Sequence, residues 1–382
     1  MRPDRSKRIV ILTADAGFGH RKAAEAVAAA LQEAYGDACS ADVVNPLDDR
    51  RVLPLLRNSQ ADSDRFSRDM REIFDRGWNA SRAAVPAASL GGALTVALFN
   101  VMRDILRTYR PDALINTYPL YHPPLAGVFA LTRRRTPLYT VVTDFGVVHS
   151  LWFSRAAAAC FVATEKVRQL AIAHGLPPEK VHITGIPVAP ALADRSRDPA
   201  EMRAALGWSL DLPVMLVVGS KRVQGLPDFL RVLNHSALPV QLAVVAGGDD
   251  ELYAELQLIE WHLPAHLYNW VADMPALMHA ADCAISKAGG LIIAETLACG
   301  LPLLLIDVLP AQEKGNVDIV LQSGAGELAL TPGAALEVLY HWLADGGALL
   351  AQRAANARAV GRPRAALDIA EHVMSQIQGS LS

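Results

Sequence analysis

The residues best suited to chemistry gather in two glycine-containing turns of this 382-residue sequence. The first turn, DAGFGH at 15–20, follows an apolar run and precedes a helix predicted over 21–35. The first N–H groups of a helix and the positive end of its dipole attract anions, and they favour the neutral, proton-accepting form of an imidazole. His20 is therefore a candidate general base, and Gly19 a candidate phosphate contact. The alternative is a histidine that only caps or packs against its own helix.

The second turn, SKAGGL at 286–291, joins a predicted strand at 283–286 to a predicted helix at 290–298. The N–H groups of Gly290 and Leu291 would lie at the start of that helix and bind a diphosphate, while Gly289 permits the tight turn. Glu295 lies one turn into the helix, where its carboxylate can accept both hydroxyls of a ribose. A plain tight loop is the alternative, which a glutamate at this offset disfavours.

Two further strand ends carry polar residues, and the carboxyl ends of parallel strands are where such folds bind ligands. Asp144 follows the strand predicted at 138–143 and would orient a base or a substrate hydroxyl, although an Asx turn or a helix cap explains it equally well. Gly219 and Ser220 follow the strand predicted at 214–218. Glycine lets the backbone approach a phosphate, and the serine hydroxyl can bind it; a plain tight turn is the alternative.

A last polar pair, Gln312 and Glu313, follows the strand predicted at 302–306. An amide beside a carboxylate suits the hydroxyl groups of a sugar ring. The alternative is a solvated loop.

Short apolar runs alternate with helical stretches along the chain, which predicts an α/β fold with parallel sheets. The stretch at 187–213, rich in proline, alanine and aspartate, separates two sets of strands and is the predicted linker. We predict two doubly wound, Rossmann-like domains facing across a cleft, at 1–195 and 196–358, with a C-terminal helix within 359–382. The predicted strands are 8–13, 40–44, 113–116, 138–143, 160–163, 214–218, 240–246, 283–286 and 302–306.

Composition excludes several classes of protein. With 52% hydrophobic and 20% charged residues, the chain is not a disordered protein. Its four cysteines are far apart and form no CxxC pair, which excludes a zinc ribbon and argues against a disulfide framework. The amino terminus, MRPDRSKRIVIL, lacks the apolar core of a signal peptide, which predicts a cytoplasmic protein.

Charge is distributed unevenly along the chain. Residues 1–195 hold 25 basic and 19 acidic side chains, a net of +6, against −9 for 196–382. The segment 50–110 alone holds 11 arginines and 6 acids. A basic half suits an anionic surface, either nucleic acid or acidic lipid, unless the charges are merely scattered over solvated faces.

Two stretches of this basic segment bear on membrane contact. Within 65–78, apolar side chains recur every four residues among arginines, as in a helix lying on a membrane surface or in an ordinary amphipathic helix. The stretch at 83–102 is uncharged and long enough to span a bilayer, but its one-sided apolar stripe predicts a packed or amphipathic helix. The first stretch contains Phe66, Met70, Phe74, Trp78, Arg68, Arg71 and Arg76, and the stripe is Leu90, Leu94, Leu98, Val101 and Ile105.

Seven stretches, in family order over most of 8–326, resemble the monogalactosyldiacylglycerol synthase and processive diacylglycerol glucosyltransferase family. They read AGFGHRKAAEAV, INTYPLYHPP, VVTDFGVVHSLWF, ATEKV, HITGIPVAP, SKAGGLIIAETLACGLPLLL and PAQEKGN. The ordered set is specific, whereas no single stretch is. The wider superfamily includes the lipid-linked N-acetylglucosaminyl transferase of peptidoglycan synthesis. The resemblance implies the GT-B fold, with the donor bound mainly by the second domain, and an inverting enzyme, peripheral on membranes, that needs neither metal nor cofactor.

The resemblance also implies roles for particular residues. His20 corresponds to the family's proposed catalytic base, and the final helix, predicted at 364–377, returns to the first domain. Gly289, Gly290 and Glu295 correspond to the family's nucleotide-sugar signature, in which Glu295 contacts the ribose. Gln312 and Glu313 correspond to residues that face the sugar, and Asn316 supports them. The loop 269–274, which includes Val271, corresponds to a loop that contacts the uracil. The sequence departs from the family in having Ala16 and Phe18 where glycine is common, and SKRVQG where the loop after Gly219 is usually glycine-rich.

Together these features predict a single displacement, in which the hydroxyl of diacylglycerol attacks the anomeric carbon of a UDP-hexose, galactose or glucose, while His20 takes the proton. The arginine-rich segment 50–110 would dock on anionic lipid at the cytoplasmic face of the membrane, and no nucleic-acid partner is predicted. Sugar transfer to a polyprenyl-linked lipid is the alternative. A dinucleotide-dependent oxidoreductase is disfavoured by Lys22 at the third glycine position of G-x-G-x-x-G. A lipid-surface adaptor without activity would need neither Glu295 nor Gln312 with Glu313.

Overall fold

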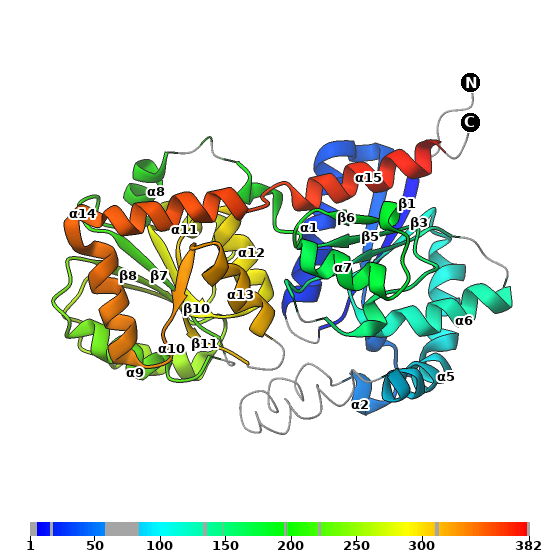
Figure 1. Cartoon of the computed structure of the whole chain (residues 1–382), viewed down its shortest axis with the longest axis horizontal. Coiled ribbons are helices and arrows are strands. Elements are labelled where there is room, and N and C mark those ends of the chain that lie inside the picture. The colour runs from blue at the N-terminus through cyan, green and yellow to red at the C-terminus, as the bar shows by residue number, and fades with distance from the viewer. Residues whose placement is uncertain are drawn as a thin grey trace. The chain divides into compact units, whose positions relative to one another are not determined.

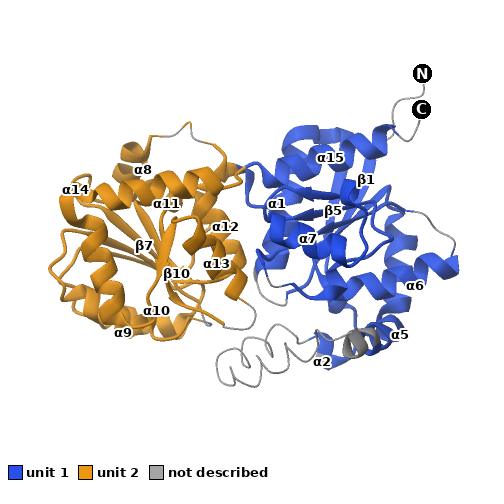
Figure 2. Ribbon diagram, viewed as in Figure 1, with its two compact units in different colours: residues 1–66, 70–190, 364–382 blue, residues 67–69, 191–363 orange. Residues whose placement is uncertain are grey.

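The structure, a computed structural model, describes residues 6–15, 18–57, 84–132, 136–146, 148–194, 196, 198–220, 223–309 and 313–379. These residues form two compact units, which Figure 2 shows in separate colours. The first unit runs to Pro190 and takes up the chain again from Arg364, and the second holds Ala191–Pro363. The predicted domain boundaries were placed nearby, at 195 and 358.

The first unit is built on a six-stranded sheet in the order β2-β1-β3-β4-β5-β6, in which every neighbouring pair is parallel. Its central strands β3, β4 and β5 are short, mostly apolar and buried at every position, as expected where helices cover both faces. The chain passes from one side of β1 to the other between β2 and β3, so the topological switch point lies between β1 and β3. The elements are β1 Lys7–Leu12, α1 Phe18–Tyr35, β2 Cys39–Val44, α2 Pro54–Arg57, α5 Ala84–Tyr109, β3 Ala113–Asn116, α6 His122–Thr132, β4 Leu138–Val141, β5 Ala159–Val162, α7 Glu165–Ala173, β6 Val181–Ile183 and α15 Ala365–Gly379.

Helices cover both faces of this sheet. Side chains alternate along β1, so Ile9 and Ile11 pack under α1 and α15, whereas Val10 and Leu12 pack under α5 and α6. The last helix, α15, lies against α1 and is drawn in red in Figure 1. The C-terminal segment therefore completes the core of the first unit, although the chain reaches it only after the second unit.

Helix α5 contains the uncharged stretch noted in the sequence. Ser89–Tyr109 has the length and mean hydropathy, 1.3, of a membrane span. Its stripe nevertheless packs in the core of the first unit, with Leu94, Leu98 and Val101 buried. The predicted packed helix is thus confirmed for the part that the structure describes. The arginine and aromatic residues of 65–78 lie outside the described residues.

The second unit also has a six-stranded parallel sheet, in the order β12-β11-β10-β7-β8-β9. Starting from β7, the chain first adds β8 and β9 on one side and then β10, β11 and β12 on the other. This is the Rossmann order, and its switch point lies between β7 and β10. The elements are α8 Pro199–Leu206, β7 Val214–Val218, α9 Leu226–Asn234, β8 Gln241–Val245, α10 Asp250–Gln257, β9 Ala265–Tyr268, α11 Met274–Ala280, β10 Cys283–Lys287, α12 Gly290–Ala298, β11 Leu303–Asp307, α13 Lys314–Gln322, β12 Gly326–Leu328 and α14 Pro332–Val360.

Helix α14, orange to red in Figure 1, is interrupted at Ala344–Gly347. Asp345, Gly346 and Gly347 have positive φ angles of 50°, 68° and 79°, a conformation that glycine adopts readily and that ends a helical turn. Before the interruption, Trp342 is fully buried, and its Nε1 donates to Glu327 at 2.9 Å. The interruption lets one helix change direction while its first part stays in the core.

Candidate active site

In the first unit, His20 lies at the carboxyl edge of the sheet, close to the switch point between β1 and β3. It is the third residue of α1, and its Nδ1 lies 3.0 Å from Oγ1 of Thr143, just beyond the end of β4. The hydroxyl of Thr117, just beyond β3, lies 3.1 Å from two carbonyl oxygens, those of Leu12 and His20. Three neighbouring strands therefore fix the backbone and the ring of His20 together.

Aromatic rings flank the imidazole of His20. The ring of Tyr118 meets it edge-on at a centroid distance of 5.1 Å, and the ring of Trp152 lies 6.0 Å away. Burial raises the pKa of Tyr118 to about 12, so this phenol stays neutral at physiological pH. The imidazole thus has an uncharged, largely apolar surround on these two sides.

A charged cluster borders the turn that precedes His20. Asp15 forms an ion pair with Arg21, whose Nη2 lies 2.8 Å from Oδ2 of the carboxylate. Asn45 donates to Asp15 at 3.3 Å and to Asp48 at 2.8 Å. Burial and the nearby Asp15 raise the pKa of Asp48. These contacts join the start of α1 to the end of β2, and sequence analysis did not identify them.

The other predicted residues of the first unit lie at the same edge. Gly19 is the second residue of α1. Asp144 is half-buried and directly follows Thr143. Sequence analysis named Asp144 and passed over Thr143, the residue that contacts the imidazole. Thr143 belongs to the same strand-end motif, so the signal was present one position earlier.

His122, at the first position of α6, is a second histidine near this edge. It is 4% exposed, its Nε2 lies 3.3 Å from the Thr140 hydroxyl, and its Nδ1 has no hydrogen-bond partner within the described part of the chain. Burial lowers the pKa of His122 from 6.5 to about 4. This imidazole is therefore neutral at physiological pH.

In the second unit, the turns after β7 and β10 meet at the switch point. Ser286 of β10 donates its hydroxyl proton to the carbonyl of Val218 at 3.0 Å. A Cβ atom on Gly219 would lie 2.8 Å from Leu226 and 3.1 Å from the carbonyl of Val245, so a larger residue there would force its neighbours to shift. Ser220 follows it, partly buried, and the next two residues, Lys221 and Arg222, lie outside the described residues.

Helix α12 begins at Gly290, as predicted, and Gly289 is its N-cap residue. A glycine cap has no side chain to bind the first N–H groups of the helix. The carbonyl of Gly289 accepts from Ile293 at 3.1 Å, and its N–H donates to Lys287 at 2.8 Å, so the turn is tightly closed. The N-terminus of α12, with the N–H groups of Gly290 and Leu291, is suited to an anion.

The remaining predicted donor residues lie in α12, in the loop after β9 and in or next to α13. Glu295 is half-buried within α12, and Val271 is half-buried in the loop after β9. Asn316, in α13, donates to the carbonyl of Ala288 at 3.0 Å. Glu313 is buried and forms an ion pair with Lys287, which sequence analysis did not single out. Gln312 lies outside the described residues.

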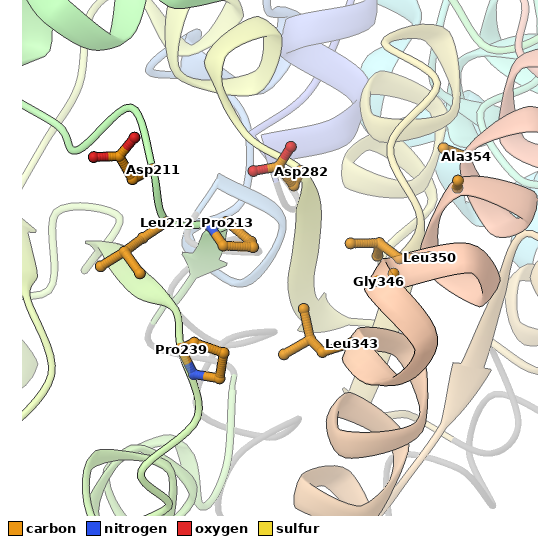
Figure 3. Close-up of a pocket in the computed structure, with 11 residues that line it drawn as sticks. Asp211, Leu212, Pro213, Pro239, Asp282, Leu343, Gly346, Leu350 and Ala354 are labelled. Carbon is orange, nitrogen blue, oxygen red and sulfur yellow. The ribbon is translucent and has the colours of Figure 1, made fainter.

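A pocket of about 460 Å³ lies elsewhere in the second unit, and Figure 3 shows its lining. Pro213 and Asp282, which directly precede β7 and β10, place it at the amino ends of these strands. It contains no predicted site residue. The carboxylate of Asp282 already accepts from Arg203 and from the N–H of Val214, each at 2.7 Å, so the pocket offers a ligand mainly apolar surface. Among the described residues, no group of three or more His, Cys, Asp or Glu side chains is arranged to hold a metal ion.

Comparison with known proteins relates both units to one family. A model of monogalactosyldiacylglycerol (MGDG) synthase matches residues 20–188, and a model of the glycosyltransferase family 28 C-terminal domain matches 214–327. MGDG synthase 3 of Arabidopsis thaliana is 29% identical over 99% of this chain and 83% of its own length. The probable MGDG synthase 2 of Oryza sativa subsp. japonica is 30% identical over 96% of this chain and 80% of its own. This chain belongs to the MGDG synthase family.

Solved structures confirm the GT-B architecture predicted for this MGDG synthase family member. MurG of Acinetobacter baumannii has a TM-score of 0.60 at 15% identity, covering 97% of this chain and 99% of its own. UDP-GlcNAc 2-epimerase of Neisseria meningitidis, bound to UDP-GlcNAc, has a TM-score of 0.62 at 16% identity, covering 97% and 100%. Because a structure named as an epimerase and one named as a glycosyltransferase, SnogD of Streptomyces nogalater, both share the fold, the fold alone does not decide the reaction.

The depressed pKa of His122 predicts that the stability of this family member depends on pH. The unfolded chain binds a proton near pH 6.5 and the folded chain only near pH 4, so stability is full above 6.5 and falls as the pH drops toward 4. The full loss is roughly 3 kcal/mol. In urea titrations across this range, His122→Gln should lack this component, whereas His174→Gln, on the surface, should keep it. Equal pH dependence of the wild type and His122→Gln would contradict the prediction.

Proposed function

We propose that this chain transfers a hexose from a UDP-hexose to the free hydroxyl of diacylglycerol, with inversion at the anomeric carbon. One structural observation carries the proposal: an imidazole at the carboxyl edge of the first sheet is fixed through Nδ1 by a threonine hydroxyl. The family supplies the chemistry, since the relatives are named for a monogalactosyldiacylglycerol product. Galactose is therefore the hexose to test first, and glucose is the alternative.

His20 acts as the general base. When Nδ1–H donates to Thr143, the lone pair of the imidazole is on Nε2, which accepts the proton of the acceptor hydroxyl. The hydroxyl oxygen then forms a bond to the anomeric carbon as the bond from that carbon to the diphosphate oxygen breaks. The electron pair leaves with UDP, and the proton stays on the imidazole. Asp144, next to Thr143, is the candidate for orienting the acceptor.

The second unit binds the donor. Negative charge grows on the diphosphate as its bond to the sugar breaks, and the N–H groups of Gly290 and Leu291 at the start of α12 stabilise it. The carboxylate of Glu295 accepts hydrogen bonds from the ribose hydroxyls, and Val271 borders the uracil. Gly219 and Ser220 contact the phosphates. Gln312 and Glu313 are the residues predicted to face the hexose, and Asn316 is predicted to support them.

Diacylglycerol resides in a membrane, so the protein must reach a lipid surface. The arginine-rich segment 50–110 suits the anionic lipid of a cytoplasmic membrane face. Replacing Arg68, Arg71 and Arg76 together by glutamine should weaken co-sedimentation with anionic vesicles and reduce its dependence on salt. A control replacing the exposed arginines Arg231, Arg362 and Arg364 should not. Wild-type binding by the first triple variant would remove this segment from the docking surface.

The function itself is tested by incubating the protein with diacylglycerol vesicles and a panel of UDP-sugars. The mass of the lipid product is then measured by mass spectrometry. Gain of one hexose mass on diacylglycerol supports the proposal. A product formed only on polyprenyl phosphate lipids would favour the alternative acceptor. Release of UDP with no glycolipid on either would overturn both.

His20→Ala should lower turnover on the order of a hundredfold or more, because the acceptor hydroxyl loses its base. Binding of UDP, measured by isothermal titration, should stay at the wild-type level, since the donor site belongs to the other unit. His174→Ala, on the surface, is the matched control. Near-normal turnover of His20→Ala would remove this residue from the base role.

Thr143 should affect turnover by orienting the imidazole of His20. Thr143→Val keeps the shape but removes the partner of Nδ1, and losing a hydrogen bond worth about 1.4 kcal/mol lowers kcat about tenfold. Thr143→Ser retains the hydroxyl and should retain most of kcat, while KM for the UDP-hexose stays constant in both variants. A valine variant with wild-type kcat, or a serine variant as slow as valine, would contradict this role.

A further inference from the structure

Lys287 and Glu313 form an ion pair inside the second unit. Their side chains are each only 9% exposed, and the ammonium donates to Oε1 of the carboxylate. Lysine and glutamate are almost never this deeply buried unless they are paired. Glu313 is the N-cap residue of α13, the helix that follows β11. The pair therefore joins two segments 26 positions apart in the sequence.

The local geometry of β10 brings Lys287 to this position. Along β10, Ser286 pairs with Leu305 of β11, but Lys287 pairs with Asp307, so the register slips by one residue between them. A bulge of this kind re-aims the side chain at the end of a strand. Lys287 is also the last residue before the turn that opens α12, so its position and the position of the turn are set together.

The carboxylate of Glu313 is occupied on both oxygens. Lys287 holds Oε1, and the N–H of Leu309 donates to Oε2 at 2.8 Å. The backbone N–H of Glu313 donates back to the carbonyl of Leu309 at 2.8 Å. Glu313 thus connects Leu309, which follows β11, to Lys287 at the end of β10.

A second bond ties the same turn to α13. Asn316 donates to the carbonyl of Ala288 at 3.0 Å, and Ala288 donates its own N–H to Asp307 at 2.8 Å. Side-chain bonds from Glu313 and Asn316 therefore hold two consecutive residues, Lys287 and Ala288. The N–H groups of Gly290 and Leu291 come one residue later, after Gly289, so the placement of these donors depends on the two bonds.

We propose that Glu313 is a positioning residue for the diphosphate of the donor, acting through Lys287 on the turn that opens α12, rather than a ligand of the hexose. This inference rests on the proposed UDP-sugar function. Glu313 then contributes to binding UDP, the part that all UDP-sugars share. Other side chains contact the hexose and distinguish one hexose from another.

Titration calorimetry with UDP, which has no hexose, separates the two roles. Glu313→Gln and Lys287→Met should each weaken UDP, UDP-galactose and UDP-glucose by the same factor, about tenfold or more for a lost charge-assisted hydrogen bond. Because the two residues act as one unit, the double variant Lys287→Met/Glu313→Gln should bind UDP no more weakly than the single variant with the lower UDP affinity. A ligand of the hexose would instead leave UDP affinity unchanged in Glu313→Gln and weaken only the two UDP-hexoses.

The double variant also protects the test against misfolding. A single substitution leaves one buried charge without its partner, whereas the double variant leaves none and should keep a cooperative thermal transition. Arg231→Met/Glu255→Gln, which removes an exposed ion pair of the same unit, is the matched control and should bind UDP as the wild type does. Wild-type UDP affinity in the folded double variant overturns the inference. A wild-type protein that binds no UDP overturns the proposed function, and the inference with it.

Discussion

Parallel pairing is the constraint on which both halves of this structure depend. When all strands of a sheet run in one direction, every strand-to-helix turn falls at the same edge, and the helices begin there with N–H groups that have no partner inside the helix. Each sheet also has one place where successive connections diverge, between β1 and β3 in the first unit and between β7 and β10 in the second. At that place the helices do not cover the edge, so α1 and α12 present their amino ends to a ligand.

Backbone groups attract an anion at such an edge, but they do not fix the side chains that react. In both units, buried bonds to neighbouring strands do this. Thr143 holds the ring of His20 and Thr117 its carbonyl, while Asn316 and Glu313 hold the turn before α12. A buried polar group left without its bond costs about 1–3 kcal/mol, so these arrangements resist rearrangement. The first unit bears such a cost at His122, whose Nδ1 has no partner within the described residues.

The sequence predicted the parts of the fold that depend on local pattern. Strands 113–116 and 214–218 and helix 290–298 match β3, β7 and α12 in full, because buried parallel strands read as continuous apolar runs and glycine marks the helix start. Strands β6, β9 and β12 were not predicted. Each is three or four residues long, and they are outer strands with partly exposed positions, so their apolar signal is weak. His20 and Gly290 were placed by the same local pattern. The pairing of Lys287 with Glu313 was not, because it depends on a register slip that only the folded sheet shows.

In the proposed function, the two units recognise their ligands by different physical means. Peptide N–H groups at the start of α12 respond to negative charge, so in the proposed function they would bind a diphosphate whatever sugar it carries. If Glu313 serves that same purpose through Lys287, neither element distinguishes galactose from glucose, which differ only in the orientation of one hydroxyl. Discrimination between epimers then requires a side chain whose hydrogen bond is satisfied by one orientation and left unmade by the other. In the proposed function, acceptor choice would rest in the same way on the surroundings of His20, where the buried rings of Tyr118 and Trp152 keep the imidazole in an apolar environment and Thr143 sets the direction in which it would take the proton.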